Sequence, residues 1–213
     1  MTIYNCISKY NIRKILDIIS KPSEIPNHIK YYFQRLVIKP VIINGRIYYR
    51  YLNDLYPEYL NKGNACSFIS EKALQYCKGY GLDIGAGEWV LPGAISIQNE
   101  IHENAYMLNR FFDNSLDYVF SSHCLEHLED WRVAINLWIR KLKIEGILFL
   151  YLPHESMKLW NPGGLWVGNI HKWKPTVEVL LPYLSSCGLE IMEFNTYRDE
   201  YWCFHIIAKR RGD

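Results

Sequence analysis

The sequence predicts an α/β protein, with a Rossmann-like, mostly parallel sheet that carries helices on both faces and follows an N-terminal helical and hairpin extension. Two observations predict this fold. From residue 68 onward, short apolar runs alternate with helical patterns, which is typical of a parallel sheet. One run, residues 146–152, is apolar without interruption, as expected for a strand buried on both faces.

The extension is predicted to span residues 1–65. Residues 10–20 and 27–37 have helical patterns. Asn44-Gly45 separates two β-rich runs, residues 41–43 and 46–49, and favours a type I′ hairpin because both central residues must accept a positive φ.

The main domain is predicted to span residues 66–213. Its expected elements are, in order, a helix over 70–77, strands over 79–84, 93–98 and 116–121, a helix over 124–142, and strands over 146–152, 191–194 and 202–208. Alternation of this kind places the ligand-binding edge of the sheet at the carboxyl ends of its strands.

Composition excludes several classes of protein. With 49% hydrophobic and 22% charged residues, the chain is not disordered. A net charge of +2 is too weak to indicate nucleic-acid or membrane partners. The six cysteines are scattered, so we expect free thiols in a reducing compartment. No apolar run reaches signal-peptide or membrane-spanning length, and we expect a cytoplasmic protein whose oligomeric state stays open.

A glycine turn, Asp83-Ile84-Gly85-Ala86-Gly87, directly follows one predicted strand. Glycines at that position let the backbone approach a nucleotide-like ligand closely. A Gly-x-Gly pair alone is a weak signal, because most such pairs are ordinary turns. Val90 replaces the third glycine of a dinucleotide site, which argues against such a site.

Four segments, taken in order, resemble the class I S-adenosylmethionine-dependent methyltransferases of the type 11-like group. They are LDIGAG at 82–87, LPGAI at 91–95, LDYVFSSHCLEHL at 116–128 and RKLKIEGILFL at 140–150. The LPGAI and SSHxLEH segments are similar to a bacterial subgroup. The resemblance implies an S-adenosylmethionine cofactor, and the subgroup implies O-methylation of a small or carbohydrate-like acceptor in surface-polysaccharide synthesis.

The same resemblance implies the cofactor-binding residues. Gln98 stands where the family has an acidic ribose-binding residue, and Asn104 stands where it has an adenine-contacting Asp. A neutral amide loses charge assistance, which is about half the strength of such a hydrogen bond. The expected set is Asp83, Gly85, Ala86, Gly87, Gln98, Asn104, Ala105 and Ser121.

Three histidines are candidate general bases, because methylation of a hydroxyl requires removal of its proton and neutral imidazole suits that task. His123 and His154 each follow a predicted strand, and His171 lies in the segment after the strand over 146–152. We expect His123 to act as the base, with His154 and then His171 as alternatives.

His123, Glu126 and His127 also form a His-x-x-Glu-His pattern. On a helix, residues i and i+4 share a face, so the two histidines could hold a metal ion, and the pattern matches an inverted zinc-peptidase signature. A metal-dependent hydrolase is therefore one alternative, and a cofactor-binding module without methyl transfer is another. We favour a structural role for these residues and expect no metal.

Three tryptophans, Trp160, Trp166 and Trp173, fall in the same segment as His171. They either form a stacking surface for a ring-shaped acceptor or cap the core.

Overall fold

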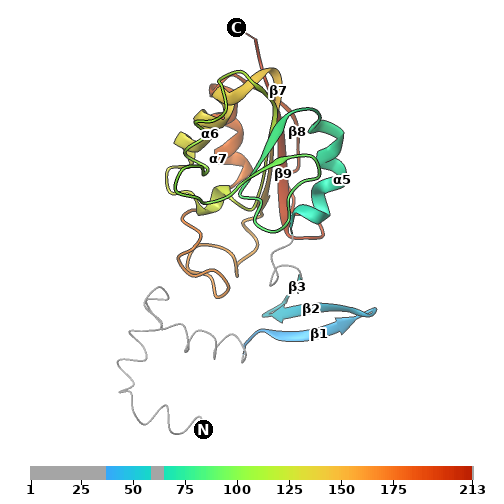
Figure 1. Cartoon of the computed structure of the whole chain (residues 1–213). Coiled ribbons are helices and arrows are strands. Elements are labelled where there is room, and N and C mark those ends of the chain that lie inside the picture. Colours follow the sequence, from blue (N-terminus) through green and yellow to red (C-terminus); the bar gives the residue numbers. More distant parts are fainter. Residues whose placement is uncertain (1–36, 59–64, 213) are drawn as a thin grey trace, which may run out of the picture.

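The structure is a computed structural model that describes residues 37–58 and 65–212. A six-stranded sheet with helices on its faces forms the main body, and a small three-stranded sheet lies against one end of it (Figure 1). This arrangement confirms the predicted Rossmann-like fold. The helices predicted over residues 10–20 and 27–37 lie outside the described residues, apart from residue 37.

The small sheet is an antiparallel meander. Its strands are β1 (Lys39–Ile43), β2 (Arg46–Tyr51) and β3 (Asp54–Pro57). Asn44 and Gly45 have φ values of 49° and 74°, as a type I′ turn requires, so the predicted hairpin is confirmed. The third strand was not expected. It follows a second tight turn in which Leu52 has a φ of 52°.

The main sheet has the spatial order β5-β4-β6-β7-β9-β8. The first four strands in this order are parallel. Strand β9 is antiparallel to both of its neighbours, β7 and β8. In that spatial order the strands are Ile95–Ile97, Gly81–Ile84, Leu116–Ser122, Leu142–Pro153, Cys203–Arg210 and Leu189–Phe194. Each of them overlaps a strand predicted from an apolar run.

Helices cover both faces of this sheet. Helix α5 (Cys66–Tyr76) lies on one face, and α6 (Trp131–Lys141) and α7 (Val177–Ser186) lie on the other (Figure 1). Successive residues of β7 serve the two cores in turn: Leu148 and Leu150 pack with α6 and α7, whereas Phe149 and Tyr151 pack with α5. This alternation explains the uninterrupted apolar run at 146–152.

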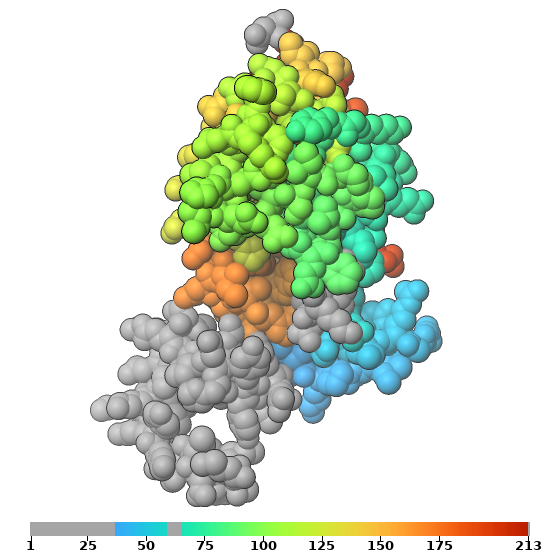
Figure 2. Space-filling view, in the orientation of Figure 1, coloured from blue at the N-terminus to red at the C-terminus, as the bar shows by residue number. Residues whose placement is uncertain are grey.

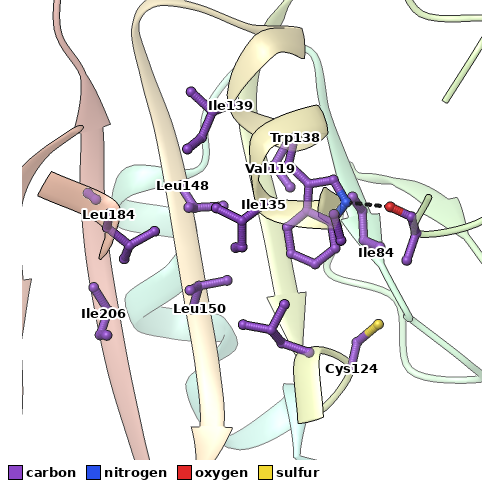
Figure 3. Packing of buried hydrophobic residues seen from close by; sticks show 14 of the residues in the cluster. Ile84, Val119, Cys124, Ile135, Trp138, Ile139, Leu148, Leu150, Leu184 and Ile206 are labelled. Atoms are coloured by element: carbon purple, nitrogen blue, oxygen red, sulfur yellow. Dashed lines mark hydrogen bonds between the residues drawn. The ribbon is translucent and has the colours of Figure 1, made fainter. Parts of the chain in front are cut away.

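Trp138 of α6 is the largest fully buried side chain of the described chain. Figure 3 shows it among Val119, Ile135 and Leu148. Its indole Nε1 donates a hydrogen bond of 2.8 Å to the carbonyl oxygen of Ala105. The helix is thereby attached to the loop that follows β5.

The helix predicted over 124–142 begins only at Trp131, so its first part was wrong. Leu125–His127 forms a single 3-10 turn instead, closed by a hydrogen bond from the His127 amide to the Cys124 carbonyl. Asp130, a residue type favoured at N-caps, precedes the true helix. His123 has a φ of 51°, so His123 and His127 do not share a helical face.

Helix α7 was not predicted, because Pro182 lies inside it and interrupts the pattern. Thr176 supplies an N-cap, with its Oγ1 accepting a hydrogen bond of 3.4 Å from the Val179 amide. Across residues 37–58 and 65–212, no helix combines the length and apolarity needed to cross a bilayer.

Residues 154–176, here called the insertion, connect β7 to α7. Part of it, orange in Figure 2, lies between the main body and the blue meander. Trp166 of the insertion makes edge contacts with Tyr49 and Tyr56 of the meander, with ring centroids 5.7 and 5.9 Å apart. The meander therefore packs on the insertion through aromatic rings.

Candidate cofactor site and histidine cluster

The candidate site lies at the carboxyl ends of β4, β5 and β6. Strand β4 pairs with β5 on one side and with β6 on the other, which makes a topological switch point. Two hollows open there, and they share Gly85 and His123 in their walls. A ligand with two chemically different ends could therefore extend across the glycine turn.

The first hollow has a volume of ≈ 280 Å³ and contains Asp83 in its wall. Asp83 Oδ2 accepts a hydrogen bond of 2.7 Å from the Leu91 amide, whereas Oδ1 has no partner among the described residues. Burial raises the pKa of this carboxyl to about 7, although the Leu91 bond opposes the shift. A cationic donor bound in the hollow would satisfy Oδ1 and stabilise the ionised form.

The glycine turn separates the two hollows. Gly85 has a φ of 82°, and a Cβ atom there would lie 2.4 Å from the Cys124 Cβ. Gly87 has a φ of 55°, and a Cβ there would meet nothing within 4 Å. Packing against Cys124 therefore demands the first glycine, whereas the second leaves open space where a ligand can approach the backbone.

The second hollow is larger, with a volume of ≈ 490 Å³, and its wall contains Gln98, Asn104 and Ala105. Gln98 Nε2 donates a hydrogen bond of 2.9 Å to the Gly87 carbonyl and so ties β5 to the glycine turn. Asn104 Oδ1 accepts from the Tyr106 amide, and its Nδ2 donates to the Glu100 carbonyl. Both amides thus shape the loops around this hollow.

Ser121, the last of the expected cofactor-binding residues, does not line either hollow. Its side chain is fully buried, and its Oγ donates a hydrogen bond of 2.9 Å to the Ile84 carbonyl. Ser122 lines the first hollow instead, with an Oγ that lacks a partner in the described chain. Strand alternation, which points neighbouring residues to opposite faces, was the signal that could have distinguished them.

Glu88 and Trp89 also line the first hollow, and neither was among the residues expected from the sequence. Both are exposed, and Trp89 keeps 46% of its surface accessible. They follow the glycine turn directly, so proximity to that turn was the available signal.

His123 is the only one of the three candidate bases that lines these hollows. Its Nε2 lies 3.1 Å from Cys203 Sγ, and its Nδ1 lies 3.5 Å from Glu126 Oε1 without a hydrogen bond. Burial lowers the pKa of His123 to about 3, so the ring is neutral at physiological pH.

The other two candidates are engaged elsewhere. His154 Nδ1 lies 2.9 Å from the Ser156 hydroxyl, and its Nε2 lies 3.3 Å from the Thr196 carbonyl. The ring of His171 is buried, and its Nδ1 lies 2.5 Å from the Trp160 carbonyl oxygen. Neither ring reaches the two hollows.

The expected runner-up metal set of His123, Glu126 and His127 is not the one that the fold assembles. Glu126, His127 and His171 form the compact group, with one potential ligand atom from each lying within 4.8 Å of the others. His171 enters the group because the insertion folds back onto the segment after β6, as shown by a hydrogen bond from the Lys172 amide to the Glu126 carbonyl.

The three tryptophans of the insertion pack against protein. The ring of Trp173 stacks on Trp131 at 4.6 Å, that of Trp160 meets His123 edge-on at 4.9 Å, and Trp166 contacts the meander. They do not form one exposed stacking surface, which supports the interpretation that they cap the core.

Comparison with known proteins identifies the family. Residues 63–150 match the family model described as a methyltransferase domain. Residues 63–150 therefore form a methyltransferase domain, in agreement with the resemblance of the four segments to S-adenosylmethionine-dependent methyltransferases. The matched residues include the glycine turn, the carboxyl ends of β4, β5 and β6, and the His-x-x-Glu-His segment.

Solved structures show the same fold at low sequence identity. An S-adenosylmethionine-dependent methyltransferase from Archaeoglobus fulgidus is 18% identical, with a TM-score of 0.53 over 72% of this chain and 97% of that one. One from Mesorhizobium loti is 14% identical, with a TM-score of 0.54 over 70% and 100% of the two chains. The cyclase SpnF also matches, at 15% identity and a TM-score of 0.51 over 70% and 82%. Among curated proteins, no sequence matches the chain.

The residues at the site of this methyltransferase fit S-adenosylmethionine. The unpartnered Asp83 Oδ1 suits the ammonium of the amino-acid end, and the open space at Gly87 leaves room beside the turn. The second hollow, on the β5 side, suits the adenosine end. The cofactor, when bound, supplies a methyl group that is already activated for transfer.

Proposed function

We propose that this methyltransferase methylates a hydroxyl of a small or carbohydrate-like acceptor, and that it serves surface-polysaccharide synthesis in the cytoplasm. The observation that carries the acceptor class is the pair Glu88 and Trp89 at the first hollow. An exposed indole offers a flat face to a ring, and a carboxylate beside it accepts hydrogen bonds from hydroxyls. The polysaccharide context is supported by the resemblance of residues 91–95 and 121–127 to a bacterial subgroup.

The proposed roles follow from the geometry. Asp83 holds the amino-acid end of the cofactor, and the backbone of the glycine turn lies beside the cofactor between its two ends. His123 is the candidate to take the proton of the acceptor hydroxyl, because it is the one candidate base of the described chain that lines both hollows. A positioned base contributes about 10²–10⁴-fold to the rate of such a step.

Release of S-adenosylhomocysteine in the presence of defined acceptors tests this proposal. We expect turnover with sugars or nucleotide sugars and little with catechols or amines. Trp89→Ala should lower kcat/KM for the active sugar, because an aromatic contact with the acceptor contributes about 0.5–1.5 kcal/mol. The affinity for S-adenosylmethionine should stay within about threefold of wild type. Turnover confined to amines would contradict the hydroxyl assignment.

A cofactor-binding module without methyl transfer is the second candidate. It is favoured by Gln98 and Asn104, whose amides are committed to backbone hydrogen bonds and carry no charge for the adenosine end. Tight S-adenosylmethionine binding without product from any hydroxyl, amine or thiol acceptor would support this candidate over the first.

A further inference from the structure

Beside the second hollow, the segment after β6 meets the insertion around a buried carboxyl. Glu126 is fully buried, and neither carboxylate oxygen has a hydrogen-bond partner among the described residues. His171 Nε2 lies 3.9 Å from Glu126 Oε1. A buried polar group without a partner costs about 1–3 kcal/mol, so a cation bound beside Glu126 would stabilise its ionised carboxylate.

We propose that Glu126, His127 and His171 bind a divalent transition-metal ion, of which zinc fits best. Their ligand atoms lie within 4.8 Å of one another. Zinc binds imidazole nitrogen and carboxylate oxygen at about 2.0–2.2 Å, which places neighbouring ligand atoms about 3.3 Å apart in a tetrahedron. The distance between His171 Nε2 and Glu126 Oε1 would need to shorten by only about half an ångström.

The donor set determines the class of ion. Two imidazoles and one carboxylate suit zinc and similar transition metals, whereas magnesium and calcium prefer sites built from oxygen. His171 Nδ1 donates a hydrogen bond to the Trp160 carbonyl oxygen, so the proton of the neutral ring is on Nδ1. Nε2 is therefore unprotonated, and it is the nitrogen nearer to Glu126. A backbone carbonyl behind a ligating histidine is the usual arrangement in metal sites.

Access and consequence also follow from the structure. His127 lines the second hollow, which gives an ion a path from solvent. Three protein ligands leave one coordination position open. Because Glu126 and His127 belong to the segment after β6 and His171 belongs to the insertion, a bound ion would hold the insertion against the sheet. This proposal is independent of the acceptor class.

Zinc binding by the full-length chain tests the proposal. Protein treated with a chelator is dialysed against a small excess of zinc chloride at pH 7.5, and bound metal is measured by mass spectrometry together with the thermal unfolding midpoint. We expect a single tightly held zinc and a raised midpoint in the wild type. His171→Ala and Glu126→Gln should each bind much less zinc, and zinc should no longer raise their thermal unfolding midpoints.

The matched control is His102→Ala, which removes an exposed histidine of the described chain. It should bind zinc as the wild type does. Glu126→Gln keeps the shape of the side chain, so it preserves the test if His171→Ala does not fold. Absence of zinc from the wild type, or equal zinc in wild type, Glu126→Gln and His102→Ala, would overturn the proposal. Magnesium in place of zinc should give no shift.

Discussion

At the scale of single residues, Gly85 and Gly87 of the same turn are needed for different reasons. Gly85 is required by the protein itself, because any Cβ would collide with Cys124. Gly87 has free space around it and is therefore the better probe of the ligand. Both have positive φ, which costs an alanine about 1–2 kcal/mol.

We predict that Gly87→Ala folds, loses about 1–2 kcal/mol of unfolding free energy, and binds S-adenosylmethionine at least about tenfold more weakly, equivalent to 1.4 kcal/mol. Gly85→Ala should lose more stability, because overpacking adds about 1–3 kcal/mol. Urea unfolding and equilibrium binding measure the two effects. Unchanged cofactor affinity in folded Gly87→Ala would place the ligand elsewhere.

Asp83 gives a pH-dependent prediction. Its pKa is about 7 in the fold against 3.8 unperturbed, so the folded state binds the proton more tightly than the unfolded chain. Stability from this group is therefore lost as pH rises from about 4 to about 7. Asp83→Asn should become more stable relative to wild type between pH 5 and pH 8 when no cofactor is present.

Thermal unfolding of both proteins across that range, without cofactor, measures the difference. The same variant should bind S-adenosylmethionine more weakly at pH 8, because a neutral amide cannot pair with the ammonium. A stability difference that does not vary with pH would show that the carboxyl is not held protonated by its burial.

At the scale of elements, what the sequence predicted depended on local chemistry. Asn44-Gly45 fixed the hairpin, and apolar runs located the strands, because turn conformation and burial on two faces are both local signals. Contacts between distant segments were not predictable. His171 approaches Glu126 only because the insertion folds back onto the segment after β6.

Two helical errors have specific physical causes. Pro182 concealed α7, although Thr176 and Glu178 form a recognisable helix start. At 124–130 the apolar pattern continued, but the buried Glu126 and the positive φ of His123 favour a 3-10 turn over a helix. Tertiary contacts overrode the local pattern at the site where the ligand-binding edge is built.

Trp138 connects helix α6 to the second hollow, because its indole donates a hydrogen bond to the carbonyl of Ala105 (Figure 3). We predict that Trp138→Phe lowers the unfolding free energy by about 2–4 kcal/mol, because it leaves a cavity and removes the partner of the Ala105 carbonyl. S-adenosylmethionine affinity should also fall, since Ala105 lines that hollow. Tyr197→Phe, at a site 84% exposed, is the control and should change neither quantity. Equal urea midpoints for the two variants would contradict this account.

At the scale of the whole molecule, aromatic rings join the meander, the insertion and the sheet. Tyr56 of the meander packs 4.4 Å from Trp202, whose indole donates a hydrogen bond of 3.1 Å to the Leu55 carbonyl. The insertion in turn packs edge-on to His123 through Trp160. The extension thus connects to the site through successive packed side chains, while a domain boundary at residue 65 remains a prediction.

The central claim is that the glycine turn and its two hollows hold S-adenosylmethionine. Equilibrium binding of labelled S-adenosylmethionine to the full-length chain at pH 7.5 tests it most directly. We predict a single saturable site, competed by S-adenosylhomocysteine and weakened by Gly87→Ala. A folded protein that shows no saturable binding, or that binds equally well after Gly87→Ala, would contradict the claim.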